Sequence, residues 1–221
     1  MDQKVYPFSA GNRTMSDLLG GKGANLAEMA TLGIPVPDGF TITTRACQDY
    51  LRTGGLGDEL LAQIDSAIID LEKKIGKSFG DPKNPLLVSV RSGAKFSMPG
   101  MMETILNVGL NDQSVLGLAK QTNNPRFAWD AYRRLIQMYG KTVLDIDGNI
   151  FAVELEKLKS SLKITADFEL PESALKELVA TYKKIILDLT GSEFPQTPRE
   201  QLDRSIRAVF DSWNTSRARL Y

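Results

Sequence analysis

The stretch LLVSVRSGAKFSMPGMMETILNVGL, residues 86–110, contains two short apolar runs separated by a loop. The first run, Leu86 to Val90, ends at Arg91, and the second covers Thr104 to Val108. Both runs are rich in residues that favour strands, so we expect two strands around the loop. Three methionines around a Pro-Gly pair are typical of an adaptable cover over a ligand. The alternative is an ordinary surface loop whose methionines pack into the core.

The sequence before this stretch predicts a mixture of helices and strands. The glycine-rich segment GGKG, residues 20–23, precedes a helical pattern from about Ala24 to Leu32, which a glycine and two prolines end. The alternating segment GFTITT, residues 39–44, predicts a half-buried strand. A long helix with one apolar face is expected from Leu60 to Ile75, and Gly76 ends it.

The sequence after this stretch is helical in pattern. Residues 111–197 carry four amphipathic patterns joined by short polar or Gly/Pro breaks, and Pro125 and Pro171 lie near two helix starts. A further helix follows in TPREQLDRSIRAVFDSW, residues 197–213, and its apolar face consists of Leu202, Ile206, Val209, Phe210 and Trp213. The end, NTSRARLY, has no cap, turn or polar tail, which we interpret as a truncation. The whole pattern predicts an α+β fold with an inserted all-helical subdomain.

The composition excludes several classes of function. Acidic and basic residues number 27 each, which argues against binding to nucleic acid or to an anionic membrane. No apolar run approaches the length of a membrane span. Cys47 is the single cysteine, which excludes an internal disulfide and indicates a reducing cytoplasm. The chain has no histidine, so it lacks histidine acid–base chemistry, histidine metal ligands and a phosphorylated histidine.

Lys22 is the first candidate for a binding residue, because it lies in GGKG directly before a predicted helix. A helix N-terminus presents unpaired amides and a partial positive charge, and glycines let a phosphate approach the backbone. The segment is not a Walker loop, since Gly23 follows the lysine, nor G-x-G-x-x-G, since Leu26 replaces the third glycine. The alternative is a tight turn with an exposed lysine.

Arg91 is the second candidate, because it ends a predicted strand, where α/β sheets place ligand-binding side chains. Its guanidinium suits a bidentate contact with phosphate oxygens, and the alternative is pairing with an acidic neighbour. Asp145 and Asp147 are discounted as metal ligands, because carboxylates two residues apart on a helix point to different faces. The residues alone therefore support an anion or nucleotide site without a nucleophile.

Three motifs together resemble one family. They are LLGGKGANLAEMATLGIPVPDGFTITT (18–44), LLVSVRSGAKFSMPGMMETILNVGLND (86–112) and NPRFAWDAYRRLIQMYG (124–140). Their order through essentially the whole chain resembles the N-terminal part of the pyruvate, phosphate dikinases. The first two motifs are also similar to those of phosphoenolpyruvate synthases, whereas the third resembles the pyruvate, phosphate dikinase branch alone.

The resemblance implies an ATP-grasp nucleotide-binding domain of a longer phosphotransferase. In that family the β-phosphoryl group of ATP passes to a histidine on a mobile domain, and inorganic phosphate takes the γ-phosphoryl group. A pyruvate-binding barrel then forms phosphoenolpyruvate. The resemblance implies that Lys22 and Arg91 contact the ATP phosphates and that Gly100 and Thr104 belong to a loop closing over them.

The resemblance also implies what this chain lacks. The ligands of Mg²⁺, the phosphohistidine domain and the barrel are expected outside it, so the chain alone would be inactive. The full-length enzyme would be a cytoplasmic homo-oligomer. The first α/β subdomain would comprise residues 1–112 plus 198–221, incomplete, and the helical insertion residues 113–197.

Three alternatives remain at this point. The first is the same region of a phosphoenolpyruvate synthase-like dikinase, which uses water in place of phosphate. The second is a non-catalytic nucleotide-binding module that retains the phosphate site. The third is a structural partner that acts through the helical insertion.

Overall fold

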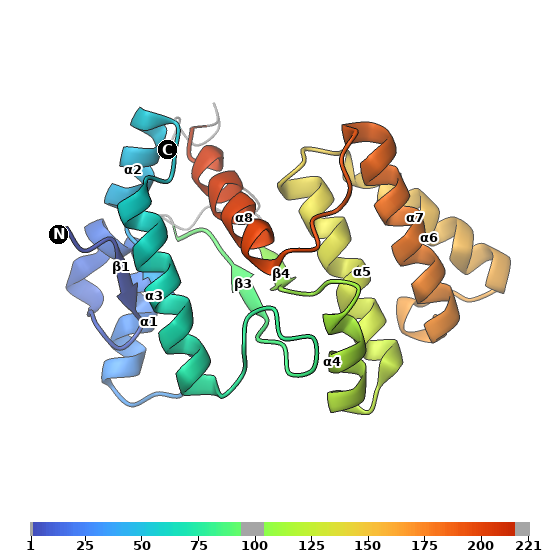
Figure 1. Ribbon diagram of the computed structural model, residues 1–221, viewed down its shortest axis with the longest axis horizontal. Helices are drawn as coiled ribbons and strands as arrows, with labels where there is room; N and C mark the ends of the chain where they lie inside the picture. Colours follow the sequence, from blue (N-terminus) through green and yellow to red (C-terminus); the bar gives the residue numbers. More distant parts are fainter. Residues whose placement is uncertain (1, 94–103, 215–221) are drawn as a thin grey trace. The chain divides into compact units, whose positions relative to one another are not determined.

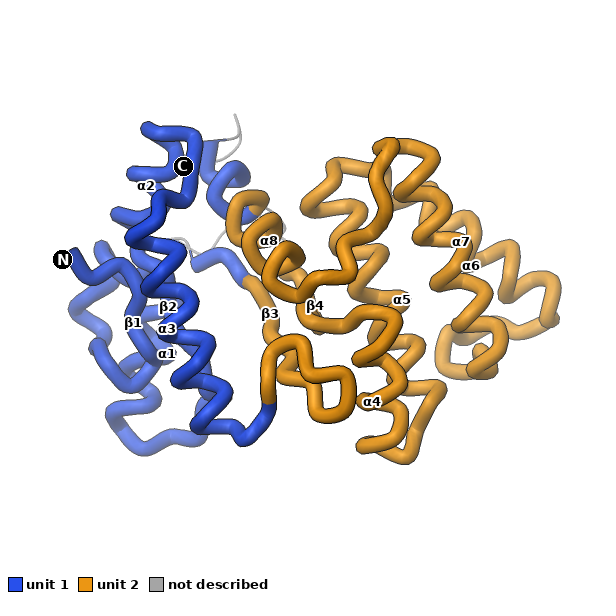
Figure 2. The backbone as a smooth tube through the Cα atoms, in the orientation of Figure 1, with its two compact units in different colours: residues 1–77, 91–103, 209–221 blue, residues 78–90, 104–208 orange. Residues whose placement is uncertain are grey.

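A computed structural model describes residues 2–93 and 104–214. The chain divides into two compact units (Figure 2): a first unit of residues 1–77, 91–103 and 209–221, and a second unit of residues 78–90 and 104–208. Both contain helices, and the described strands pair antiparallel, so the predicted α+β class is confirmed. The predicted subdomain boundaries at residues 113 and 197 stay a prediction.

In its described residues, the first unit combines a strand pair with several helices (Figure 1). Strands β1 (Val5–Pro7) and β2 (Phe40–Ile42) are antiparallel, with Tyr6 opposite Thr41. The helices are α1 (Ser16–Thr31), which follows the 3₁₀ turn η1 (Arg13–Met15), α2 (Thr44–Thr53) and α3 (Asp58–Ile75). Gly76 adopts a left-handed conformation at the end of α3, so the predicted helix stop is confirmed.

The core of the first unit uses small side chains where α1 is buried. Leu19, Ala24 and Ala27 form one apolar cluster, and Tyr6 packs against it. The buried Phe210 ring lies 5.4 Å, centroid to centroid, from the buried ring of Tyr50 in α2. Phe210 belongs to the final turns of helix α8 (Pro198–Ser212), which the first unit includes, so this contact anchors the end of α8 to α2.

In the part that the structure describes, the second unit combines a strand pair with the predicted helices. Strands β3 (Val88–Val90) and β4 (Ile105–Val108) are antiparallel, with Val88 opposite Val108, as the two apolar runs predict. The four expected amphipathic helices are confirmed as α4 (Ser114–Thr122), α5 (Pro125–Thr142), α6 (Gly148–Leu162) and α7 (Glu172–Thr190), with the 3₁₀ turn η2 (Asp167–Glu169) before α7.

Aromatic rings form much of the core of the second unit. Tyr132 and Tyr139 of α5 both contact Phe194 edge-on, with centroids 6.1 and 5.3 Å apart. Tyr182 of α7 contacts Phe151 of α6 at 5.0 Å, and its hydroxyl donates a hydrogen bond of 2.9 Å to the Phe151 carbonyl. These contacts join α6 to α7, and α5 to the segment between α7 and α8.

One buried amide connects three backbone segments of the second unit. The Gln201 side chain in α8 is fully buried, and its Oε1 accepts a hydrogen bond of 2.9 Å from the Gly109 amide. Its Nε2 donates to the carbonyls of Leu110, at 2.9 Å, and Pro195, at 2.8 Å. Gln201 therefore joins the segment after β4 to the segment before α8.

Over residues 2–93 and 104–214, no helix has both the length and the apolar character that a membrane crossing needs.

Candidate functional site: two cations on adjoining segments

Helix α1 is interrupted at Gly20, which has φ 70° and ψ 166°. Only glycine adopts this conformation at low cost. The helix starts again at Gly21, so Lys22 lies in the first turn of the longer part of α1. The first amides of a helix have no partner within it and carry a partial positive charge. The predicted helix start behind GGKG is thus confirmed, with its beginning a few residues earlier than expected.

The segment after β3 lies directly on this turn, within the first unit. A Cβ atom placed on Gly20 would be 1.7 Å from the carbonyl oxygen of Gly93. A Cβ atom placed on Gly93 would be 3.9 Å from the Cβ atom of Lys22. Gly93 and Gly20 therefore meet backbone to backbone, which brings the segment that carries Arg91 next to Lys22.

Two further contacts hold the Lys22 turn in place. A Cβ atom on Gly23 would be 2.8 Å from Cγ2 of Thr41, so α1 lies against strand β2 with no room for a side chain. The Thr44 hydroxyl, at the start of α2, donates a hydrogen bond of 2.7 Å to the Asp17 carbonyl. The turn is thus fixed on both β2 and α2.

Lys22 and Arg91 are both exposed. Within the described parts of the chain, no hydrogen bond or ion pair involves the Lys22 ammonium or the Arg91 guanidinium. Lys4 of the same unit differs, because its ammonium lies 2.9 Å from Asp49 Oδ2. That hydrogen bond raises the pKa of Lys4 and lowers the pKa of Asp49. The acidic partner considered as an alternative for Arg91 does not occur among the described residues, within which neither cation is neutralised by an ion pair.

The other two candidate residues are not part of this arrangement. Gly100 lies outside the described residues. Thr104 is half-buried, directly precedes β4 and belongs to the second unit.

The described residues also contain no group of three His, Cys, Asp or Glu side chains that could hold a metal ion. Asp147 instead caps α6, where its carboxylate accepts a hydrogen bond of 3.0 Å from the Asn149 amide. Asp145 and Asp147 lie between α5 and α6 and not on a helix, so the helical spacing by which the sequence discounted them is wrong.

Two residues next to the site were not singled out as functional by the sequence. Ser92, between Arg91 and Gly93, is only 3% exposed, and its Oγ accepts a hydrogen bond of 3.2 Å from Nε1 of Trp213. The sequence assigned Trp213 only to the apolar face of the last helix. A contact between residues 121 positions apart leaves no local pattern by which sequence reasoning could find it.

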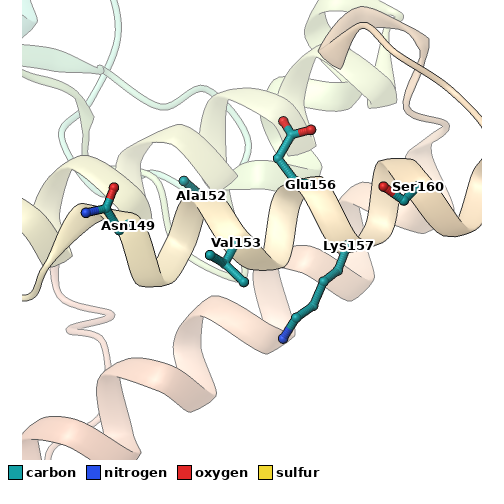
Figure 3. A pocket seen from close by; sticks show the side chains of 6 residues that line it. All are labelled: Asn149, Ala152, Val153, Glu156, Lys157 and Ser160. Atoms are coloured by element: carbon teal, nitrogen blue, oxygen red, sulfur yellow. The ribbon is translucent and has the colours of Figure 1, made fainter.

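A shallow surface depression on the second unit is a weaker candidate (Figure 3). All its lining residues come from α6: Asn149, Ala152, Val153, Glu156, Lys157 and Ser160. Its charged groups already have partners, because Glu156 pairs with Lys159 at 2.8 Å and Lys157 with Glu154 at 2.7 Å. This surface lacks the unpaired positive charge that makes Lys22 and Arg91 suited to an anion.

Comparison with known proteins assigns the chain to a class. It matches the family model for the pyruvate phosphate dikinase AMP/ATP-binding domain over residues 16–67 and 58–221. It is 50% identical to pyruvate, phosphate dikinase 2 of Oryza sativa subsp. japonica, covering 99% of this chain and 25% of the relative. It is also 50% identical to pyruvate, phosphate dikinase of Clostridium symbiosum, with 100% and 26% covered, and 49% identical to the chloroplastic pyruvate, phosphate dikinase 1 of Zea mays, with 99% and 24% covered.

The class is thus an adenine-nucleotide-binding domain related to phosphotransferases. Within that class, the chain belongs to the pyruvate phosphate dikinase AMP/ATP-binding domain family. The resemblance found in the three motifs is confirmed. The chain spans about a quarter of the length of the curated relatives it matches.

Proposed function

We propose that this chain binds the phosphate groups of ATP with Lys22 and Arg91. The observation that carries the proposal is the backbone contact between Gly20 and Gly93, which brings the segments bearing the two cations together. Both side chains are exposed and have no partner in the described part of the chain. Because the chain belongs to an AMP/ATP-binding domain family, we propose ATP as the ligand.

The chemistry of the proposed site follows from its charges. The Lys22 ammonium acts as a point charge, whereas the Arg91 guanidinium contacts two phosphate oxygens at once. The amides in the first turn of the restarted α1 add donors directed toward an anion. Phosphoryl transfer relies on such positioning and charge neutralisation. We assign Gly100 and Thr104 to the loop that closes over the nucleotide, as the family resemblance implies.

We further propose the role of the chain within a whole enzyme of ATP-grasp type. That enzyme would convert ATP, pyruvate and phosphate to AMP, phosphoenolpyruvate and diphosphate, as the names of the relatives suggest. The chain has no histidine to carry the phosphoryl group, so a phosphohistidine domain and a pyruvate-binding barrel must supply the other steps. This chain alone is then inactive. The enzyme is proposed to be a cytoplasmic homo-oligomer.

Magnesium is the other cofactor expected with ATP. The described residues offer no group of three acidic, cysteine or histidine donors, so they do not fit a complete Mg²⁺ site. We therefore propose that the ligands of Mg²⁺ lie outside this chain.

Calorimetric titration with MgATP tests the proposed site. The wild-type chain should bind MgATP, and Lys22→Ala and Arg91→Ala should each weaken binding at least tenfold, as expected for loss of one charge-assisted hydrogen bond. The double variant should show no measurable binding. Inorganic tripolyphosphate should compete with ATP, because the contacts involve phosphate oxygens.

The matched control removes the same charges elsewhere in the first unit. Lys73 in α3 and Arg52 in α2 are exposed, and each pairs with a carboxylate on its own helix. The variant carrying Lys73→Ala and Arg52→Ala should bind MgATP like the wild type. If both double variants bound MgATP equally weakly, the loss of affinity would follow from net charge alone. That result would contradict a defined phosphate site.

A further inference from the structure

We propose that Trp213 is a positioning residue for the phosphate site. Its indole N–H holds the Arg91–Gly93 segment in place against the Lys22 turn. This inference rests on the proposed function, because it requires that Lys22 and Arg91 hold phosphate. It assigns to Trp213 a role in nucleotide affinity, in addition to any part in the core.

The contact itself is specific in geometry. Nε1 of Trp213 lies 3.2 Å from Oγ of Ser92, and the indole N–H can only donate, so Ser92 accepts. Ser92 is 3% exposed, although its neighbour Arg91 is exposed. The buried Ser92 hydroxyl therefore anchors the segment between Arg91, which faces solvent, and Gly93, which contacts α1.

The position of Trp213 is itself fixed by contacts at the end of α8. The Trp213 amide donates to the Phe210 carbonyl at 3.1 Å, which continues the end of α8. The Phe210 ring is anchored on Tyr50, and both rings are more than nine-tenths buried. The indole is itself half-buried, so its environment can respond when the neighbouring segment moves.

Because Ser92 lies between Arg91 and Gly93, the hydrogen bond to Trp213 restrains the positions of both Arg91 and Lys22. Gly93, directly after Ser92, meets Gly20 and lies beside Lys22, and Arg91 directly precedes Ser92. Loss of the hydrogen bond would let this segment shift against the Lys22 turn and change the spacing of the two charges. Misplacement by about 1 Å is enough to weaken a binding constellation strongly.

Two conservative variants separate this role from simple packing. Trp213→Phe keeps an aromatic ring and removes the N–H donor, and Ser92→Ala removes the acceptor. Each should raise the Kd for MgATP about fivefold, the loss that one neutral hydrogen bond predicts. The double variant should bind no more weakly than the weaker of the two single variants, because each of them already lacks this bond.

The matched control is Trp129→Phe, the same substitution at the other tryptophan, which lies in α5 beside Lys176. It should leave the Kd for MgATP unchanged. It also leaves Trp213 as the only indole, so MgATP or tripolyphosphate should change the emission of this variant. The change should shrink when Ser92→Ala is added. If Trp213→Phe does not fold, the role of Trp213 is tested by the Kd of Ser92→Ala for MgATP and by the fluorescence emission of Trp213 in the Trp129→Phe variant.

The outcomes distinguish the two proposals. If the wild type binds MgATP and Lys22→Ala abolishes binding, but Trp213→Phe and Ser92→Ala bind normally, the role of Trp213 is overturned while the phosphate site stands. Changes in unfolding temperature without changes in Kd would likewise assign Trp213 to packing alone. If the wild type binds neither MgATP nor tripolyphosphate, the phosphate site and the inference resting on it both fall.

Discussion

The carbonyl oxygen of Gly93 occupies the space that a side chain on Gly20 would need, 1.7 Å from the position of its Cβ atom. Gly20 also has a positive φ of 70°, which breaks α1 just before Lys22. Steric exclusion and backbone conformation thus require glycine at this position independently. The same contact brings the two cation-bearing segments together.

Gly20→Ala should therefore destabilise the protein and weaken nucleotide binding together. Backbone strain at such a φ costs about 1–3 kcal/mol. Displacement of the Gly93 carbonyl adds to it, so we expect a loss above about 3 kcal/mol in the free energy of unfolding, measured with urea. Binding of MgATP should weaken at least as much as in Lys22→Ala.

Gly33→Ala is the matched control for this prediction. Gly33 has a similar φ of 73°, but a Cβ atom there would meet nothing within 4 Å. It should cost only about 1–2 kcal/mol, the backbone contribution alone, and leave nucleotide binding intact. Equal losses of stability in the two variants would mean that the contact with Gly93 contributes nothing.

A second prediction concerns the buried amide of Gln201. Gln201→Leu keeps a similar volume but leaves the Gly109 amide and the carbonyls of Leu110 and Pro195 without their partner. Each buried unsatisfied group costs about 1–3 kcal/mol, so for three groups the free energy of unfolding should fall by about 3–9 kcal/mol. Urea unfolding monitored by circular dichroism measures this loss.

Gln121 offers a comparison with the same chemistry at the surface. Its Nε2 donates to the Lys83 carbonyl at 2.9 Å and to Asn84 Oδ1 at 2.6 Å, and the residue is exposed. Water can replace both bonds, so Gln121→Leu should change the free energy of unfolding by less than about 1 kcal/mol. A similar loss at both positions would show that burial of Gln201 does not matter.

Local patterns in the sequence predicted most of the elements. Gly76 ends α3 in the left-handed conformation that a glycine stop predicts, and Pro125 begins α5 behind the cap Asn124. The strand pair of β3 and β4 followed from two apolar runs. Such features depend on neighbours within a few residues, which is why one sequence is enough to predict them.

The candidate site was predictable only in part. Lys22 could be placed at a helix start, but the meeting of its turn with Gly93 depends on the fold. The glycines of GGKG were interpreted as room for a phosphate, whereas the structure uses Gly20 and Gly23 for contacts with Gly93 and Thr41. The contact of Trp213 with Ser92 joins distant residues and leaves no periodic signal. The roles of Gly100 and Thr104 remain predictions.

A third prediction concerns the pH dependence of stability through Cys47. Burial, with the charge of Asp211 adding to it, raises the pKa of this thiol from 9.0 to about 12. Between these values the unfolded chain loses the thiol proton and the folded chain retains it. The unfolded state then binds fewer protons, so the free energy of unfolding falls as the pH rises from about 9 to 12.

Cys47→Ala isolates this effect, because other titrating groups are common to both proteins. The stability advantage of the wild type over the variant should be constant below pH 9 and narrow above it. Urea unfolding between pH 7 and about 10.5 measures the difference. An advantage that does not change with pH would contradict a raised pKa. In the native protein, alkylation of the thiol should be slow at pH 8.

The last prediction compares two neighbouring arginines that share one carboxylate. In α5, Nη2 of Arg133 lies 2.5 Å from Asp130 Oδ1, and Nη2 of Arg134 lies 3.0 Å from Asp130 Oδ2. The Arg133 side chain is 4% exposed and the Arg134 side chain 55%. Arg133 also lies 3.7 Å from Asp167 Oδ2 and donates a hydrogen bond of 3.1 Å to Gln137 Oε1, so the two arginines differ both in burial and in their further partners.

Burial determines what the loss of each arginine costs. Arg133→Ala leaves the buried Asp130 with only its surface partner and opens a cavity, so we expect a loss of about 3–5 kcal/mol in the free energy of unfolding. Arg134→Ala removes an exposed ion pair, which water and salt largely replace, at about 0–1 kcal/mol. Adding Asp130→Asn should recover part of the loss in Arg133→Ala, because it removes the charge left without its buried partner. Equal losses in the two single variants, or no recovery in the double variant, would show that the buried pair is not the source of the stability.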